Sequence, residues 1–170
     1  MELNQNNAVC QLGLLESKAY LYASLFILGN ILFPQLCHLV PNGGQMLLPI
    51  YFFTLIAAYR FGFGVGLLTA VGSPLVNHFL FGMPATGVLA LLIVKSVLLA
   101  VIAATVAQWL GRATLFGVAF AVIASQMTGI LLQWLFTLQL SAAVQSVYVA
   151  VPGIVLQVFG GWWLLRKLSK

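Results

Sequence analysis

The chain has 170 residues and a net charge of +5, with 62% of its residues hydrophobic and 5% charged. This composition is typical of a polytopic membrane protein and excludes a sizeable water-soluble domain, because apolar segments occupy almost the whole length. Between Ala19 and Leu165 the only charged residues are Arg60, Lys95 and Arg112. They are scattered singly, so we expect no nucleic-acid partner, which would require a basic patch.

Six hydrophobic segments predict six transmembrane helices in one membrane domain that covers residues 1–170. In chain order the segments cover residues 17–36, 46–60, 61–81, 87–110, 113–138 and 141–166. The second is short, at about 22 Å from the usual helical rise, and we expect it to begin inside a folded-in loop. Glycine and proline mark the breaks between segments. The sequence therefore predicts an all-α fold.

The positions of the basic residues predict an orientation. If both termini are cytoplasmic, every loop or terminal Lys and Arg falls on the inner side of the membrane, and the outer loops contain none. These residues are Lys18, Arg60, Arg112, Arg166, Lys167 and Lys170. Five or seven helices would place some of these charges outside. The pattern therefore favours six helices with both termini inside.

The residues required for catalysis are largely missing. The acidic residues are Glu2 and Glu16, both ahead of the first helix, so the spans contain no paired carboxylates for acid–base work or a proton relay. The two histidines and two cysteines lack metal-ligand spacing. No Walker-type glycine loop is present, so a partner would have to hydrolyse any ATP. We expect a protein that is not an enzyme and has no cofactor or metal.

Lys95 is the outlier among the charged residues. It lies about eight residues into the fourth predicted helix, and hence about 12 Å deep. An ammonium at that depth is costly unless it is paired or wetted. One interpretation is that Lys95 snorkels toward the outer surface along a packed helix. The interpretation we favour is that it faces a water-filled pocket and meets an anionic group of a ligand, because the spans offer no acid.

Other polar residues lie in the same outer half of the predicted bundle. Gln126 and Gln133 are seven residues apart and share a face of the fifth helix, whereas Gln145 and Tyr148 share a stripe of the sixth. Amides inside lipid more often tie helices together than bind ligands, so that alternative stays open for each glutamine. Together with Lys95, these four residues are candidates for ligand binding.

The outer ends of the helices add further candidates. The loop over residues 37–45 contains proline, which stiffens it, and a Gly-Gly pair, which admits backbone conformations closed to other residues. Such a loop can fold over a cavity as a lid and bring Asn42 and Gln45 to a ligand, although a plain tight turn is the alternative. Asn77 and His78 lie near the outer end of the third helix. For His78, a hydrogen-bonded structural role is the alternative.

Several short motifs carry a resemblance to a known family. In order they are Ala19-x-x-x-Ala23, Pro41-Asn-Gly43-Gly44-Gln45, Arg60-Phe-Gly62-Phe-Gly64-x-Gly66, Ser73-Pro74 and Gly82-Met-Pro84. With six helices and inner termini in a chain of this size, the sequence resembles the substrate-binding S-component of energy-coupling factor (ECF) vitamin transporters. The motifs cover about residues 19–110, and the remainder is similar by helix count.

The resemblance implies a subunit of the bacterial cell membrane that captures a small vitamin or vitamin precursor from the outer side. It implies a membrane-embedded T-component and two ATPase subunits as partners within and beneath the lipid bilayer. Ala19 and Ala23 would contact the T-component, and residues 38–45 would form the lid. The pocket residues would be Lys95, Gln126, Gln133, Gln145 and Tyr148.

Two departures from the family pattern bear on the ligand. Lys95 stands where relatives often carry an acidic residue, and the Thr-Gly-Gly-Tyr signature of biotin-type members is absent. We therefore expect a ligand with a carboxylate or phosphate. The alternative from another class is a small six-helix scaffold protein of the rod-shape-determining type, in which the polar residues only join helices.

Overall fold

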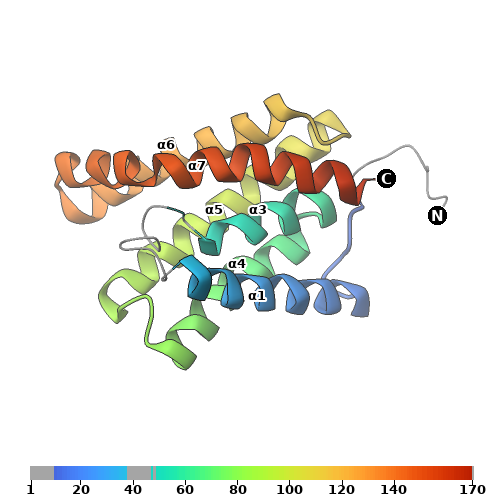
Figure 1. Ribbon diagram of the computed structural model, residues 1–170, viewed down its shortest axis with the longest axis horizontal. Helices are drawn as coiled ribbons and strands as arrows, with labels where there is room; N and C mark the ends of the chain where they lie inside the picture. Colours follow the sequence, from blue (N-terminus) through green and yellow to red (C-terminus); the bar gives the residue numbers. More distant parts are fainter. Residues whose placement is uncertain (1–9, 38–46, 48, 170) are drawn as a thin grey trace.

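The computed structural model describes residues 10–37, 47 and 49–169 and forms a bundle of helices (Figure 1). Within these residues there are six α-helices and no strand. The helices are α1 (Ser17–Cys37), α3 (Pro49–Phe61), α4 (Phe63–Phe81), α5 (Thr86–Leu110), α6 (Leu115–Thr137) and α7 (Leu140–Leu168). The predicted all-α fold is confirmed, and the predicted segments agree with these helices to within a few residues at each end.

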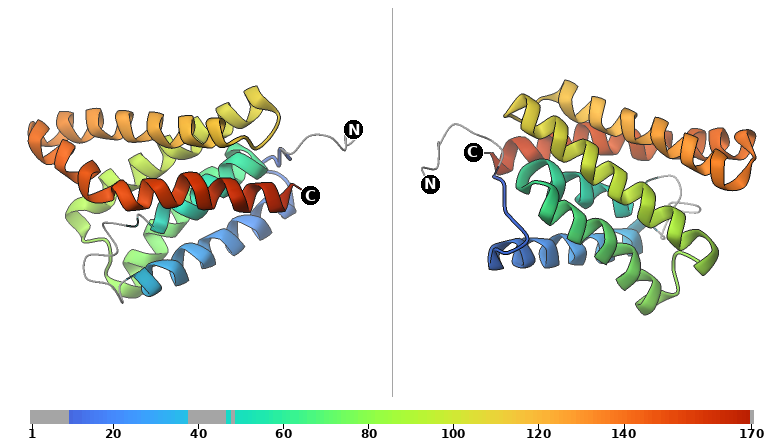
Figure 2. Two further views of the ribbon diagram at one scale, coloured as in Figure 1. Left: turned by 45° about the horizontal axis from the view of Figure 1, so that its top comes forward. Right: turned by 180° about the vertical axis from the view of Figure 1, so that it is seen from behind.

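Five of the described helices, α1, α4, α5, α6 and α7, are long and apolar enough to cross a membrane. Helix α3 has 13 residues and is therefore about 20 Å long, less than the apolar core of a bilayer. Helices α1, α4, α5 and α7 all contact it, so the shortest helix lies inside the bundle. Figure 2 shows the same packing from two further sides. The chain is thus a polytopic helical membrane protein.

Small residues bring α3 and α4 unusually close together. Gly62, which joins the two helices, has a φ of 86°, a conformation that favours glycine over every other residue. One turn into α4, a Cβ built on Gly66 would lie 2.5 Å from the Cβ of Ala58 in α3. Ala58 and its neighbour Ala57 in α3 are both fully buried. The α3–α4 pair therefore depends on the absence of a side chain at position 66.

A buried polar cluster joins α1, α3 and α4. The Nδ2 of Asn30 donates to the Oγ1 of Thr54 at 3.3 Å and to the Oγ of Ser73 at 2.9 Å. The Nδ2 of Asn77 donates to the backbone oxygen of Asn30 at 3.0 Å. Hydrogen bonds of this kind hold membrane helices together, because lipid offers the amides no alternative partner. Sequence reasoning overlooked Asn30.

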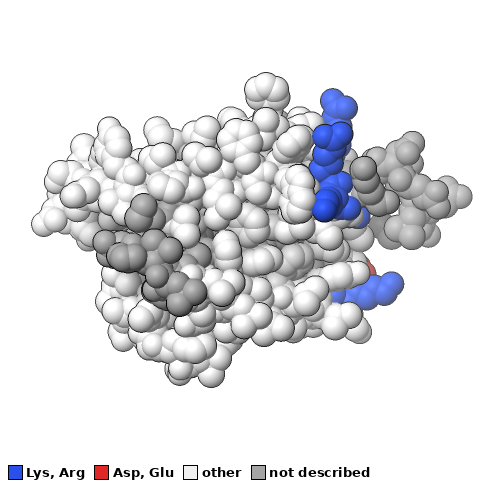
Figure 3. Space-filling view, viewed as in Figure 1, with Lys and Arg blue, Asp and Glu red and all other residues white. Residues whose placement is uncertain are grey.

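On the face shown in Figure 3, the visible Lys and Arg side chains gather at one end of the bundle, the end at which both described ends of the chain lie. The N–H of Cys10 donates to the backbone oxygen of Arg60 at 2.8 Å, and the Nε of Arg60 donates to the oxygen of Leu168 at 3.3 Å. The Tyr59 hydroxyl donates to the oxygen of Arg112 at 3.2 Å. The loop arginines predicted to share one side of the membrane therefore do lie together.

Replacing Gly66 with alanine tests the close packing of α3 against α4. We expect Gly66→Ala to lower the free energy of unfolding by about 1–3 kcal/mol, because the new methyl overlaps Ala58. Chemical denaturation in detergent micelles measures this. The control is Gly87→Ala in the first turn of α5, where an added Cβ meets nothing within 4 Å. Equal stability of the two variants would contradict the packing described.

Candidate functional site

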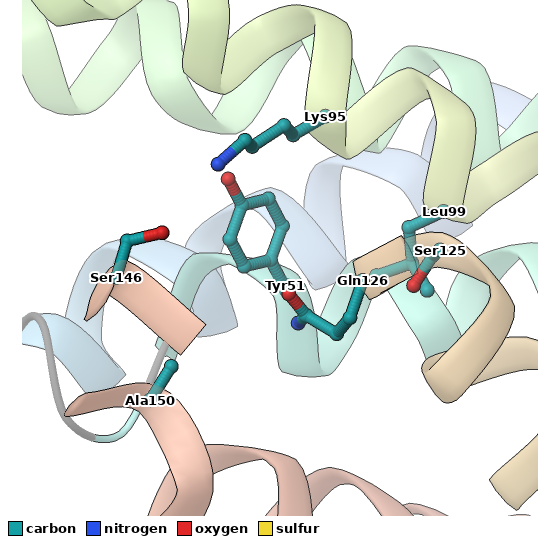
Figure 4. A pocket seen from close by; sticks show the side chains of 7 residues that line it. All are labelled: Tyr51, Lys95, Leu99, Ser125, Gln126, Ser146 and Ala150. Carbon is teal, nitrogen blue, oxygen red and sulfur yellow. The ribbon is translucent and has the colours of Figure 1, made fainter. Parts of the chain in front are cut away.

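A polar cavity of about 90 Å³ lies among α3, α5, α6 and α7 (Figure 4). The residues that line it are Tyr51, Lys95, Leu99, Ser125, Gln126, Ser146 and Ala150. Five of the seven are polar, although the four helices are otherwise strongly apolar. About three water molecules would fill this volume. The cavity is therefore small, can hold water and is lined by side chains from four helices.

Small residues on α6 and α7 leave room for the long side chain of Lys95. A Cβ built on Gly129 in α6 would lie 3.5 Å from the Cε of Lys95, so the lysine stem passes over a bare stretch of backbone. On α7 the buried positions Ala143, Ala150 and Gly153 have the spacing of one helix face. That face turns Ser146 and Ala150 toward the cavity.

The ammonium of Lys95 is held by a hydrogen-bond network that crosses three helices. Its Nζ donates to the Oε1 of Gln133 in α6 at 2.6 Å. The Oγ of Ser146 in α7 lies 3.2 Å from the same oxygen and donates to it. Figure 4 shows the ammonium pointing toward the Tyr51 hydroxyl inside the cavity. Lys95 thus points into a polar hollow and not along the outer surface.

No acidic residue follows Glu16 in the sequence, so the chain supplies no carboxylate to neutralise Lys95 from within the bundle. Glu16 itself is exposed at the start of α1 and caps the N–H of Gly13, at the basic end of the molecule. A charge inside an apolar bundle is costly unless it is paired with an opposite charge or solvated by polar groups. One amide oxygen and the cavity provide the solvation seen in this structure.

The candidate residues on α6 and α7 have different outcomes. Gln126 lines the cavity and Gln133 binds the lysine. Gln145 and Tyr148, predicted as pocket residues, do not line this cavity. Both lie on the exposed face of α7, where 74% of the Tyr148 surface is accessible. The reason is that α7 turns its small residues inward, so this polar stripe faces outward.

The candidates near the outer helix ends are not brought to the cavity. Asn77 is 3% exposed and belongs to the cluster around Asn30. The Nδ1 of His78 lies 2.7 Å from the backbone oxygen of Pro84 and ties the end of α4 to the following turn, which is the structural alternative foreseen for it. Asn42 and Gln45, with the predicted lid at 38–45, lie outside the described residues.

The small pair on α1 serves packing within this chain. Ala19 is 0% exposed and Ala23 is 3% exposed, and α1 contacts α3 and α4. Their size lets α1 approach these helices closely. Ala23 also lines an apolar groove between α1 and α4, together with Tyr20, Ser24 and Ile27.

Sequence reasoning missed three polar cavity residues, namely Tyr51, Ser125 and Ser146. Serine in a membrane helix gives a weak signal, since its hydroxyl can bond to its own backbone, as Ser125 does to the oxygen of Val122 at 2.7 Å. Tyr51 could have been recognised from the sequence more easily than the two serines. It is a phenol in the first turn of the helix that is too short to span, and so lies at membrane depth inside the bundle.

No protein-family model, curated protein or solved structure matches the chain. A functional conclusion therefore rests on the geometry of the cavity and on the motifs of the sequence. The cavity brings together an ammonium, three hydroxyls and an amide. Such a set can bind a negatively charged polar group through charge-assisted hydrogen bonds.

Removing the amide oxygen that binds Lys95 tests the network. We expect Gln133→Leu to lower the free energy of unfolding by about 1 kcal/mol, since hydrogen bonds between membrane helices are modest in strength. Gln145→Leu on the exposed face of α7 is the matched control and should leave stability unchanged. Denaturation in detergent compares the two. A loss no larger for Gln133 than for Gln145 would show that the network contributes nothing.

Proposed function

We propose that this chain is a membrane-embedded solute-binding subunit that captures a small anionic molecule through Lys95. The observation that carries the proposal is an ammonium in a polar cavity inside an apolar bundle, in a chain with no acid beyond Glu16. A ligand that brings its own negative charge would complete this site. A packed scaffold helix has no need of a cation at this position.

Within that class, we propose an S-component of an ECF vitamin importer. The order of the motifs between Ala19 and Pro84 supports this, as do the six helices, the short α3 inside the bundle and the position of the cavity among the later helices. A T-component and two ATPase subunits would then be its partners, because the chain has no phosphate-binding glycine loop of its own. The ligand would be a vitamin or precursor with a carboxylate or phosphate.

We propose that the basic end faces the cytoplasm of a bacterial cell and that the cavity takes its ligand from the opposite side. Lys95 lies about 14 Å from the Thr86 end of α5 and about 23 Å from the Leu110 end, which is the basic one. The site is therefore nearer the proposed outer surface. The excess of Lys and Arg at one end supports this orientation through the positive-inside rule.

The size of the cavity bears on what it holds. Sites for drug-sized ligands have volumes of roughly 300–1,000 Å³, whereas this cavity measures about 90 Å³. In this conformation it accommodates the charged group of a ligand and not a whole vitamin. The structure therefore shows a site for the charged group of the ligand only.

Mass spectrometry of compounds that co-purify with the detergent-extracted chain tests the proposed function. We expect an anionic small molecule at about one per chain, and we expect Lys95→Ala to lose it, because truncation removes the cation that faces the anion. Lys18→Ala, at the exposed basic end, is the control and should retain it.

Two results would contradict the solute-binding role. One is the absence of any stoichiometric compound after growth in rich medium, which would favour a scaffold protein. The other is equal retention by the chain and by a folded Lys95→Ala variant. Thermal unfolding of the variant shows whether it is folded, and removal of the half-buried charge should leave its stability close to that of the parent chain.

A further inference from the structure

Among the described residues that line the cavity, Lys95 is the one charged residue. Lys95 is the only charged residue in the sequence between Arg60 and Arg112. The other described residues of the lining are neutral: Tyr51, Leu99, Ser125, Gln126, Ser146 and Ala150. A ligand with a single negative charge would leave the site neutral. A ligand with two would leave one negative charge uncompensated within the apolar bundle, which is strongly unfavourable.

The hydrogen bonds already made within the site show which groups remain for a ligand. Ser125 donates its hydroxyl hydrogen to the backbone oxygen of Val122 at 2.7 Å. The single hydroxyl hydrogen of Ser146 is shared between the backbone oxygen of Ala143 at 2.7 Å and the Oε1 of Gln133 at 3.2 Å. Lys95 uses one of its three hydrogens on Gln133. In Figure 4 the Tyr51 hydroxyl and the Lys95 ammonium point toward one another, and the two side chains line the same cavity from different helices.

Building on the proposed function, we infer that the cavity selects a monoanionic carboxylate, with Lys95 and the Tyr51 hydroxyl as its two binding groups. The ammonium donates to one carboxylate oxygen and the phenol donates to the other. Two donors from two helices suit a group with two equivalent oxygens. The volume of about 90 Å³ admits a carboxylate and its first carbon atoms. The substrate class is therefore a carboxylic acid, and doubly charged phosphate esters are excluded.

Three small probes of similar size test this selection on the full chain in detergent micelles at pH 8. Propionate carries one negative charge and propionamide carries none, whereas ethyl phosphate carries nearly two, since its second pKa is about 6. Saturation-transfer NMR with titration of each probe gives its Kd. We expect propionate to bind at least about tenfold more tightly than either of the others.

Two variants identify the binding groups. Tyr51→Phe should weaken propionate about tenfold by removing one hydrogen bond to a charged group. Tyr148→Phe, the same change on the exposed face of α7, should leave the Kd unchanged. Lys95→Met keeps the length of the side chain and should abolish the preference for propionate over propionamide.

Each contrary result has a distinct meaning. Equal affinity for propionate and ethyl phosphate, both lost in Lys95→Met, would overturn the selection of monoanions and leave the solute-binding role in place. An unchanged Kd in Tyr51→Phe would remove Tyr51 from the site. Absence of propionate binding to the parent chain would overturn the carboxylate assignment, while co-purification decides the solute-binding role separately. The probe series on the parent chain holds even if a variant fails to fold.

Discussion

An ammonium inside a membrane bundle has to be solvated by the protein, and this constraint determines the arrangement around Lys95. Its Nζ reaches the amide oxygen of Gln133, which also accepts from Ser146. The contact joins α5, α6 and α7 at one depth. The chain contains no acidic residue after Glu16 that could neutralise the charge of Lys95. The site is therefore solvated but has no acidic partner for Lys95, and under the proposed function an external anion would complete it.

The cavity lies beside the first turn of the short α3. The helix extends about 20 Å from its end at the basic side, and Lys95 lies about 23 Å from the same end of α5. Full-length helices α5, α6 and α7 continue past the point where α3 begins. Tyr51, in the first turn of α3, lies about 15 Å from the basic end of its helix, and its side chain lines the same cavity as Lys95. The polar cluster around Asn30 fixes the other side of α3 against α1 and α4.

The sequence predicted the helices well and the site in part. Helix positions followed from the apolar segments, because lipid forces long apolar runs into helices. Lys95 was found because a charge at membrane depth is rare, and Gln126 and Gln133 because they are amides on one face. Gln145 and Tyr148 were expected in the pocket but do not line this cavity, since the rotation of α7 depends on which of its faces packs inward. The small residues Ala143, Ala150 and Gly153 mark the face of α7 that packs inward. The periodicity of the polar residues alone did not reveal which face that is.

The central claim is that an anion from outside the chain reaches the ammonium of Lys95. A crystal structure of the full chain grown with sodium bromide tests it most directly, because bromide is a monoanion located by its anomalous scattering. We expect an anomalous peak inside the cavity, in contact with the Nζ of Lys95 and close to Tyr51. Bromide confined to the basic end, with the cavity walls packed against the lysine, would contradict the account.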